Sequence, residues 1–398
     1  MKNLLFVDDE PRVLQGLERQ LRWARREWNM SFFDGGAKAL EFMAGNPVDV
    51  VVTDMMMPGM DGALFLSEVV KRHSNTVRIV LSGHAGRESV MRLVGPAHQY
   101  LSKPCDPEEL RNAIARAFTL RDLLTNEKLK QLATRTRALP SLPALQMQLD
   151  REMGKDEPSI ERVAEIISKD MAMTTKIMQL VNSAFFGLPQ QISDTTEAVM
   201  YLGLATVRGL ALSLQVFLQY DQKKVKGFSI DELSNHSWKT AVLARRIAQA
   251  EGCDTKFDDQ CFLAGMLHDL GQLILGTGLP EDYARVLAAA RENKQPLWQA
   301  ERAEFGSTHA DVGAYLLGLW GLPNPVVEAV AMHHDPSASP VRSFTPLVAV
   351  HVANAFAHEH AGSLDQYPGN QIDMEHLAAV GAADRLGHWR ERCFDDGL

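Results

Sequence analysis

The chain has few cysteines and no segment that resembles a signal peptide. Its 398 residues include only 4 cysteines, Cys105, Cys253, Cys261 and Cys393. They are too few and too scattered for a disulfide framework or a zinc-finger spacing. The N-terminus turns acidic at Asp8 after four apolar residues, which cannot form the apolar core of a signal peptide. We therefore expect a protein of the cytoplasm.

The chain also lacks an apolar run suited to a membrane. The most apolar stretch, residues 202–220, carries Arg208 and Gln215. Because a charged residue within a bilayer is costly, we interpret this stretch as a buried amphipathic helix. No association with a membrane is expected.

A surplus of basic residues is missing as well. The net charge is −9, from 41 Lys and Arg against 50 Asp and Glu. The first 125 residues hold 16 side chains of each sign, so the acidic surplus lies in residues 126–398. Proteins that bind nucleic acid normally present a basic face to the phosphate backbone. We expect no binding to DNA, and partners that are proteins or small ligands.

The first 120 residues alternate between short apolar runs and helical patterns. The expected strands are residues 4–7, 30–33, 48–53, 77–81 and 99–101. The expected helices lie near residues 11–24, 36–45, 61–73 and 87–94, and another begins near residue 107. Buried strands that alternate with helices predict an α/β fold with a doubly wound five-stranded parallel sheet.

The strand pattern then ends. Helical periodicity continues with no Pro or Gly before Pro140, which predicts a connector helix over residues 121–138. Residues 139–398 are expected to form an all-α domain whose helices are separated by turns. We therefore predict two domains, residues 1–120 and residues 139–398, joined by that helix.

Charged and hydroxyl residues follow the ends of the expected strands. Asp8 and Asp9 follow the first strand, Asp54 the third, Ser82 the fourth and Lys103 the fifth. In a parallel sheet these ends meet at one edge. Three carboxylates there would attract a divalent cation such as Mg²⁺. The chemistry that fits is phosphoryl transfer to Asp54.

This arrangement closely resembles the response-regulator receiver domain of two-component signalling, which implies a flavodoxin-like fold for the sheet. The matching motifs are Val7-Asp8-Asp9-Glu10, Thr53-Asp54-Met55-Met56-Met57-Pro58-Gly59-Met60-Asp61-Gly62, Leu81-Ser82-Gly83 and Tyr100-Leu101-Ser102-Lys103-Pro104. The resemblance implies that Asp54 is the phospho-acceptor and that a histidine kinase is the partner. It also implies that Mg²⁺ is held by Asp9, Asp54 and the carbonyl of Met56.

The same resemblance assigns roles to the rest of the pocket. It implies that Asp8 contacts Mg²⁺ through water, that Ser82 and Lys103 contact the phosphoryl group, and that Tyr100 is the switch aromatic. We interpret the side chains of Met55 and Met57, with that of Met56, as packing and loop filler rather than a cofactor site.

The second half places histidines on helices expected to be buried. The clearest case is His268-Asp269 within residues 261–275, a stretch that is apolar nearly all round. A His and an Asp there must be paired or metal-bound. Taken singly, a buried histidine is most often a hydrogen-bonded core residue. Five histidines and one aspartate on such helices point instead to an ancestral metal site. They are His236, His268, Asp269, His309, His333 and His334.

Their order resembles the HD superfamily of metal-dependent phosphohydrolases, with departures. Relatives of the HD-GYP type carry Lys where this chain has Gln272, and Asp where it has Asn354. Their Gly-Tyr-Pro loop is replaced by residues 335–340. A neutral amide is a poorer ligand for a divalent cation. His351 and His358 share a helical face with Asn354, which leaves open a changed ligand set.

The remaining motifs resemble the HD-related output domain, HDOD. They are Leu139-Pro140-Ser141-Leu142-Pro143, Ile166-Ile167-Ser168-Lys169-Asp170, Asn182-Ser183-Ala184-Phe185-Phe186-Gly187, Tyr201-Leu202-Gly203 and Leu319-Trp320-Gly321-Leu322-Pro323. The resemblance implies a regulatory domain rather than an enzyme. We expect a phosphorylated response regulator whose output domain acts on a downstream protein or on a second copy of the chain. A transition metal in the output domain is possible but is not the favoured interpretation. The alternatives are a metal-dependent phosphodiesterase acting on a cyclic dinucleotide or other nucleotide, and an inactive nucleotide-binding sensor.

Overall fold

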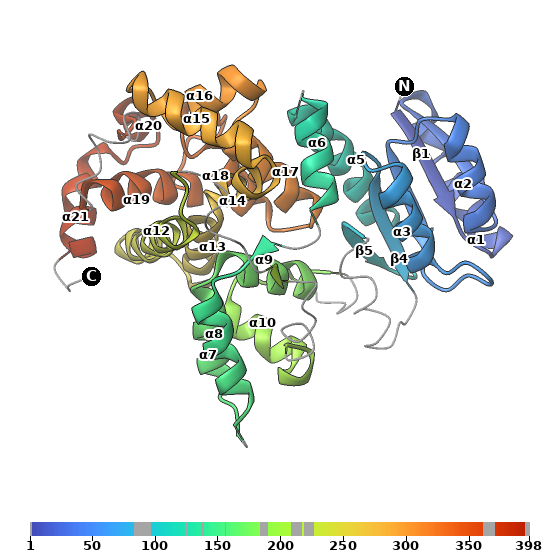
Figure 1. Cartoon of the computed structure of the whole chain (residues 1–398), viewed down its shortest axis with the longest axis horizontal. Coiled ribbons are helices and arrows are strands. Elements are labelled where there is room, and N and C mark those ends of the chain that lie inside the picture. Colours follow the sequence, from blue (N-terminus) through green and yellow to red (C-terminus); the bar gives the residue numbers. More distant parts are fainter. Residues whose placement is uncertain are drawn as a thin grey trace. The chain divides into compact units, whose positions relative to one another are not determined.

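The chain divides into two compact units (Figure 1). The first comprises residues 1–138 with the later segments 179–191 and 318–321, and the second comprises the remaining residues. The computed structural model describes residues 2–82, 97–124, 126–136, 139–155, 157–183, 190–207, 217–218, 227–360 and 371–394.

A five-stranded parallel sheet forms the core of the first unit. Its strands are β1 (Lys2–Val7), β2 (Trp28–Phe33), β3 (Val50–Asp54), β4 (Val77–Ser82) and β5 (Gln99–Ser102), in the order β2-β1-β3-β4-β5. All neighbouring strands run parallel. The predicted sheet is confirmed, and each strand lies within two residues of its expected position.

Helices surround the sheet where the pattern predicts them. They are α1 (Pro11–Gln20), the 3-10 turn η1 (Arg22–Arg26), α2 (Gly36–Gly45), α3 (Gly62–Arg72) and α5 (Pro107–Leu123). The helix expected near residues 87–94 falls outside the described residues. Residues 4–7 of β1 are no more than 2% exposed, and residues 50–52 of β3 no more than 1%. Continuous apolar strands of this kind are typical of parallel sheets covered on both faces.

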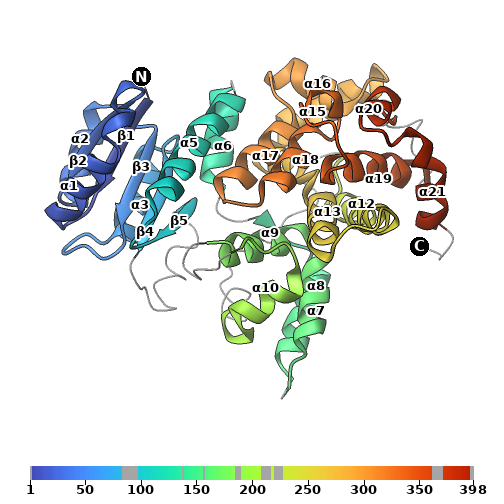
Figure 2. The ribbon, with the colours of Figure 1, turned by 180° about the vertical axis from the view of Figure 1, so that it is seen from behind.

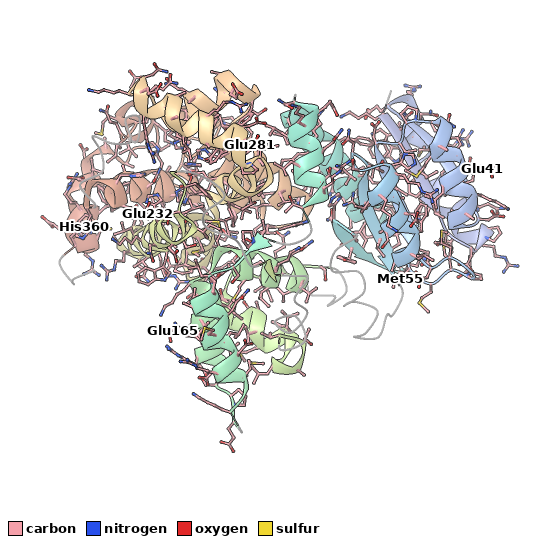
Figure 3. All side chains as sticks on the ribbon, viewed as in Figure 1. Glu41, Met55, Glu165, Glu232, Glu281 and His360 are labelled. Atoms are coloured by element: carbon pink, nitrogen blue, oxygen red, sulfur yellow. The ribbon has the colours of Figure 1, made fainter. Side chains whose placement is uncertain are left out.

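The turn between β3 and α3 is closed tightly beside Asp54. The Asp61 side chain caps α3 by accepting a hydrogen bond from the Leu64 N–H at 2.8 Å. The Gly62 N–H donates to the Met55 carbonyl at 2.9 Å. A Cβ atom on Gly62 would overlap the carbonyl oxygen of Asp54, so this position requires glycine. The first turn of α3 therefore lies directly against the end of β3. Figure 3 labels Met55, the residue that follows β3.

The connector differs from the single helix that periodicity predicts. Helix α5 ends at Leu123, and Leu124 is extended with φ −98° and ψ 112°. Asn126 then caps α6 (Glu127–Arg135) by accepting from the N–H groups of the first turn. Arg78 of β4 donates to the Thr134 carbonyl at 2.8 Å, so α6 folds back onto the sheet of the first unit.

Helices make up most of the chain after residue 138. They are α7 (Pro143–Met153), α8 (Ile160–Ser168), α9 (Met171–Val181), α10 (Thr195–Leu202), α12 (Ile230–Ala250), α13 (Thr255–Leu267), α14 (Leu270–Gly278), α15 (Pro280–Glu292), α16 (Leu297–Phe305), α17 (His309–Leu319), α18 (Asn324–Met332), α19 (Pro346–His360), α20 (Met374–Ala379) and α21 (Leu386–Phe394), with short turns η4 (Pro336–Ala338) and η5 (Ala383–Arg385). The helical character of this region is as predicted.

Helices α12, α13 and α19 lie side by side in the second unit (Figure 2). Every residue of α19 from Pro346 to Ala357 is buried. Two glycines allow close approach of backbones here. A Cβ on Gly265 of α13 would press on Ala241 of α12, and a Cβ on Gly271 of α14 would overlap the His309 carbonyl. These contacts bring the ends of α13, α14 and α17 together.

One short pairing departs from the all-helical expectation. Strand β6 (Leu139–Pro140) runs parallel to β7 (Phe217–Leu218). Strand β7 lies within residues 202–220, which we expected to form one buried helix. Residues 208–216 and 219–226 of this stretch fall outside the described residues. Within the described part of the chain, no helix is long and apolar enough to cross a membrane.

Candidate functional site

The first candidate site lies where β1, β3 and β5 end. Asp8 and Asp54 are 2% and 7% exposed, respectively. The Lys103 Nζ lies 2.6 Å from Asp8 Oδ2 and 2.5 Å from Asp54 Oδ1. Burial alone would lower the pKa of Lys103, but the hydrogen bonds to Asp54 and Asp8 raise it above its usual value. A charged ammonium therefore bridges two buried carboxylates that lie 46 positions apart in the sequence.

Backbone N–H groups hold both carboxylates in place. The Met56 N–H donates to Asp54 Oδ2 at 2.8 Å, and the Glu10 N–H donates to Asp8 Oδ1 at 2.9 Å. Asp9, next to Asp8, is half-buried. Carboxylate and carbonyl oxygens are the ligands that Mg²⁺ prefers, so the residues present fit that ion.

Tyr100 and Ser82 complete the predicted receiver set. Tyr100 on β5 is 7% exposed and belongs to the apolar core of the sheet. Burial raises the pKa of its phenol well above the usual value. Ser82 ends β4 opposite Ser102, but its side chain lies outside the described part of the structure. The structure thus brings Asp8, Asp54 and Lys103 together.

The methionines after Asp54 divide into two kinds. Met55 and Met57 are 1% and 6% exposed and pack in the core, in keeping with the packing role expected for them. Met56 is 67% exposed and Leu64 of α3 is 48% exposed. Both line a hollow of about 570 Å³ beside the β3–α3 turn.

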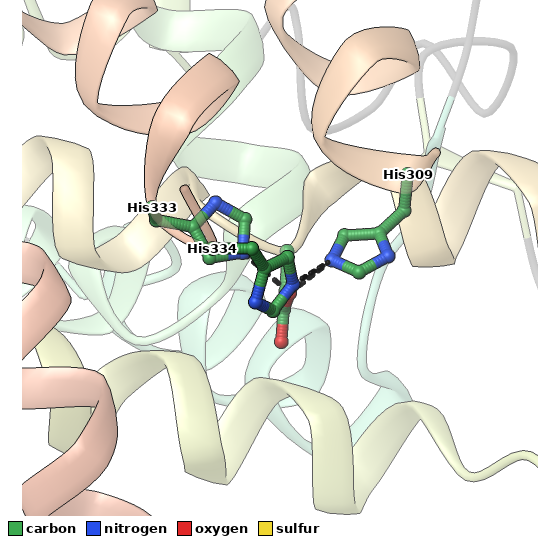
Figure 4. Close-up of side chains that lie close together, drawn as sticks. His309, His333 and His334 are labelled. Atoms are coloured by element: carbon green, nitrogen blue, oxygen red, sulfur yellow. Dashed lines mark hydrogen bonds and ion pairs between the residues drawn. The ribbon is translucent and has the colours of Figure 1, made fainter. Parts of the chain in front are cut away.

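The second candidate site is a cluster of histidines around Asp269. His236 lies on α12, His268 follows α13, His309 begins α17, and His333 and His334 follow α18. Figure 4 shows the rings of His309, His333 and His334 close together. All six predicted residues are brought to one place in the second unit.

Asp269 lies between two pairs of imidazoles. Its Oδ1 atom is 3.1 Å from His309 Nε2 and 3.7 Å from His333 Nε2. Its Oδ2 atom is 3.3 Å from His268 Nε2 and 3.8 Å from His236 Nε2. Two groups with metal-ligand spacing therefore share this carboxylate, Asp269 with His309, His333 and His334, and Asp269 with His236 and His268.

The protonation states within the cluster differ. Burial would raise the pKa of Asp269, but the imidazoles of His268 and His309 hold it well below its usual value. Burial would lower the pKa of His309, but Glu301 and Asp269 raise it to about 10. Burial, aided by neighbouring imidazoles, lowers the pKa of His236 to about 3 and that of His333 well below its usual value. The pKa of His309 and the pKa values of its neighbours His236 and His333 are therefore shifted in opposite directions.

Two buried nitrogen atoms in the cluster lack a hydrogen-bond partner among the described residues. They are Nε2 of His268 and Nε2 of His333, whose Nδ1 atoms bond the carbonyls of Gly265 and Val330 at 2.8 Å. Because Nδ1 of each ring bonds a backbone carbonyl, Nε2 is the nitrogen that faces Asp269 and can take up a proton or a metal ion there. Unpartnered buried nitrogens of this kind suit a divalent cation.

Asn354, His351 and His358 contact members of the histidine cluster. Asn354 Oδ1 is 3.0 Å from His236 Nε2. His358 stacks on His236 with ring centroids 4.4 Å apart. His351 bonds the His333 carbonyl through Nδ1, and its Nε2 accepts from the Asp373 N–H at 2.8 Å. His351 therefore orients the paired histidines through backbone contacts rather than facing Asp269.

Sequence reasoning missed Glu301 and Tyr283. Glu301 on α16 is completely buried and lies 2.6 Å from His309 Nδ1, and it also accepts from the Tyr283 hydroxyl at 3.0 Å. In the sequence, Glu301 sits next to Arg302 in a charged segment and reads as solvated surface. Nothing in the local pattern marks it as buried.

Comparison with known proteins assigns a family to each part of the chain. A family model for the response regulator receiver domain matches residues 4–115, and one for the HDOD domain matches residues 139–336. A solved structure, the MmoQ response regulator from Methylococcus capsulatus, aligns at 23% identity with a TM-score of 0.50. It covers 64% of this chain and 98% of its own, and this likeness shows the fold.

Curated relatives match over shorter parts. An uncharacterized protein of Treponema pallidum is 27% identical over 258 residues, which is 64% of this chain and 48% of that protein. The hydrogenase transcriptional regulatory protein HoxA of Cupriavidus necator is 32% identical over 153 residues, 38% of this chain and 30% of its own. The chain thus spans less than half the length of these relatives. The two family models nevertheless cover most of the chain, which belongs to the response regulators that join an N-terminal receiver domain to an HDOD domain.

Proposed function

We propose that the protein receives a phosphoryl group on Asp54 from a histidine kinase and signals through a non-catalytic HDOD output. The burial of Asp8 and Asp54 beside the Lys103 ammonium carries this proposal. A carboxylate can attack phosphorus only where the added negative charge is balanced. The ammonium and a divalent cation together supply that balance.

Oxygen ligands at the strand ends are the proposed Mg²⁺ site. Asp9, Asp54 and the Met56 carbonyl would hold the ion, and Asp8 would contact it through water. In the transfer, an Asp54 oxygen bonds to phosphorus while the bond from phosphorus to the kinase histidine breaks. Mg²⁺ would neutralise phosphoryl oxygens and carry no covalent step.

The signal would begin with rearrangement around the new phosphoryl group. Lys103 contacts Asp54 Oδ1, so modification of that carboxylate must change the Lys103 contact. Ser82 would hold a second phosphoryl oxygen, and Tyr100 would act as the switch aromatic. The proposed output is a changed contact with a downstream protein or with a second copy, without DNA binding. The acidic surplus of residues 126–398 supports a protein partner.

Acetyl phosphate with Mg²⁺ tests the receiver assignment. Intact-mass analysis should show a gain of one phosphoryl group on the full chain. Asp54→Asn should abolish the gain, whereas Asp34→Asn, an exposed residue paired with Lys38, should leave it unchanged. A wild-type chain that is not modified would exclude the proposed phosphorylation switch.

One observation favours a second candidate function, a metal-dependent phosphodiesterase acting on a cyclic dinucleotide or another nucleotide. The observation is the convergence of His268, His309 and His333 on Asp269, with two buried nitrogens unpartnered. When bound at such a site, a divalent cation activates water and polarises a phosphoryl oxygen. The replacements Gln272 and Asn354 argue for the regulatory function as the first choice.

Metal analysis and a turnover assay separate the two functions. The second candidate predicts divalent transition metal in the purified chain and cyclic-dinucleotide hydrolysis that His268→Ala abolishes. Metal without hydrolysis would exclude the phosphodiesterase and keep the metal centre. A rise in melting temperature with a nucleotide, again without hydrolysis, would indicate the inactive nucleotide-binding sensor.

A further inference from the structure

Glu301 is a carboxylate with no solvent exposure at the edge of the histidine cluster. Its Oε2 atom lies 2.6 Å from His309 Nδ1 and accepts from the His309 N–H at 2.8 Å. Its Oε1 atom accepts from the Tyr283 hydroxyl at 3.0 Å. Tyr283 is itself completely buried. A buried carboxylate is tolerated only when it is paired and hydrogen-bonded, and helices α15 and α17 provide those partners here.

These contacts set the orientation of the His309 ring. A carboxylate accepts hydrogen bonds and does not donate, so Nδ1 of His309 carries the hydrogen. The opposite nitrogen, Nε2, then faces the centre of the cluster. It lies 3.1 Å from Asp269 Oδ1 and 2.9 Å from His334 Nε2. The dashed contact between the His309 and His334 rings is drawn in Figure 4.

We propose that Glu301 is a positioning residue for a divalent transition metal, fixing His309 as an Nε2 ligand, with Tyr283 holding the second carboxylate oxygen. This inference rests on the metal centre of the second candidate function. Histidines that bind metals commonly donate their other N–H to a carboxylate, which fixes the tautomer and raises ligand basicity. Glu301, His309 and Asp269 have that arrangement.

The donor set indicates the class of cation. Imidazole nitrogens from His309, His333 and His334 meet one carboxylate, Asp269. Imidazole suits transition metals, whereas Mg²⁺ and Ca²⁺ prefer oxygen ligands. The cluster and the oxygen-lined receiver pocket should therefore select different ions in the same chain.

The competing explanation of the Glu301–His309–Asp269 contacts is that His309 holds a second proton rather than a metal ion. A doubly protonated His309 could donate to both Glu301 and Asp269, and the cluster would then be a structural ion pair. That explanation predicts no metal binding. It also predicts that loss of Glu301 changes stability without changing any metal affinity, which separates the two explanations.

Cobalt binding to the full chain tests the proposal. The protein is stripped with a chelator and titrated with Co²⁺ in a large excess of Mg²⁺, which occupies the receiver pocket. Visible absorption reports nitrogen ligands, and competition with a chelator gives the Kd. We expect Co²⁺ to bind the wild type, and Glu301→Gln to weaken binding by about 10–100-fold. Glu304→Gln, an exposed residue on the same helix, should leave the Kd unchanged.

Two outcomes would count against different parts of the scheme. A wild type that binds no Co²⁺ overturns the metal centre itself. A wild type that binds, with Glu301→Gln folded and binding equally well, overturns only the role of Glu301. Tyr283→Phe removes a single hydroxyl and should weaken binding by a few-fold, because one of the hydrogen bonds that hold Glu301 is lost.

The tautomer of His309 gives a readout that needs no variant. In the ¹⁵N spectrum of histidine-labelled protein saturated with diamagnetic Zn²⁺, the His309 ring should carry its hydrogen on Nδ1, and its Nε2 resonance should be shifted from that of the metal-free protein. A neutral ring with its hydrogen on Nε2 would overturn the proposal, even if Glu301→Gln fails to fold.

Discussion

The two candidate sites balance buried charge in opposite ways. In the receiver, two buried carboxylates, Asp8 and Asp54, share one ammonium from Lys103. In the HDOD unit, one carboxylate, Asp269, is surrounded by imidazoles. The receiver pocket has more acidic than basic groups, and the HDOD cluster has more nitrogen donors than carboxylates.

This difference in charge indicates which kind of ion each site can bind. A surplus of carboxylate attracts a hard cation that prefers oxygen ligands. A surplus of neutral imidazoles with unpartnered nitrogens suits a softer transition metal or a proton. The receiver pocket is held by strand ends in one sheet. The HDOD cluster is held by α12 and by the ends of α13, α14, α17 and α18, so its geometry depends more on packing.

The largest effect is expected at the centre of the HDOD cluster. Asp269→Ala removes the buried carboxylate that His236, His268, His309 and His333 share, so these four imidazoles lose their common charged partner. We expect the free energy of unfolding to fall by about 3–5 kcal/mol. Urea unfolding measures the loss, and hydrogen exchange should localise it to α13, α14 and α17. Asp282→Ala, at a surface ion pair with Arg285, should change stability by less than about 0.5 kcal/mol. Equal stability of the two variants would contradict a charge-balanced centre.

The second largest loss of stability is expected where α14 and α17 approach each other closely beside the histidine cluster. Gly271→Ala places a methyl group against the His309 carbonyl, so α14 and α17 must separate. The expected loss is roughly 2–3 kcal/mol, confined to the HDOD unit. Gly387→Ala on α21 is the matched control, because a Cβ there meets nothing within 4 Å. A similar small effect of both substitutions would show that α14 and α17 can shift apart freely.

In the receiver, charge balance should respond to Mg²⁺. Lys103→Met leaves Asp8 and Asp54 without their shared ammonium, and we expect a loss of about 1–2 kcal/mol without divalent cations. Because an ion that binds only the folded state stabilises it, added Mg²⁺ should reduce this loss. Thermal unfolding with and without Mg²⁺ provides the measurement, and exposed Lys38→Met is the control. A loss that Mg²⁺ does not change would argue against a cation site at these carboxylates.

The smallest effect tests the break in the connector. Asn126→Ala removes the side chain that caps α6, which should cost about 1 kcal/mol. Lys128→Ala on the same turn should be nearly neutral. Hydrogen exchange of α6 amides would report the change directly. Unchanged protection would mean that packing alone holds α6 on the sheet of the first unit.

Local patterns were sufficient to predict that Asp8, Asp54 and Lys103 lie close together. Apolar runs of strand length alternate with helical periods, and Asp8, Asp54 and Lys103 directly follow strands. A parallel sheet brings such positions to one edge whatever the details of packing. The histidines of the output were also found, because polar groups in apolar helices stand out. Their convergence on a common site was inferred from the whole set of buried polar residues, and the order of these residues then resembled the HD superfamily.

Other features could not be predicted from local sequence. The helical period continues through Leu124, yet the chain is extended there, because α6 gains more from packing on β4 through Thr134 and Arg78. The β6–β7 pair consists of two-residue strands that leave no periodic signal. In each case, contacts between distant segments outweigh a weak local preference.

The sequence by itself determined the parallel sheet, the helical second half and the identity of the groups at both sites. These depend on periodicity, on strand ends and on residue type. Only the tertiary structure decided that Asp269 lies between two pairs of imidazoles and that Glu301 is buried against His309. The physical reason is that those contacts join separate helices, whose relative placement is set by side-chain packing and by close approach at Gly265 and Gly271.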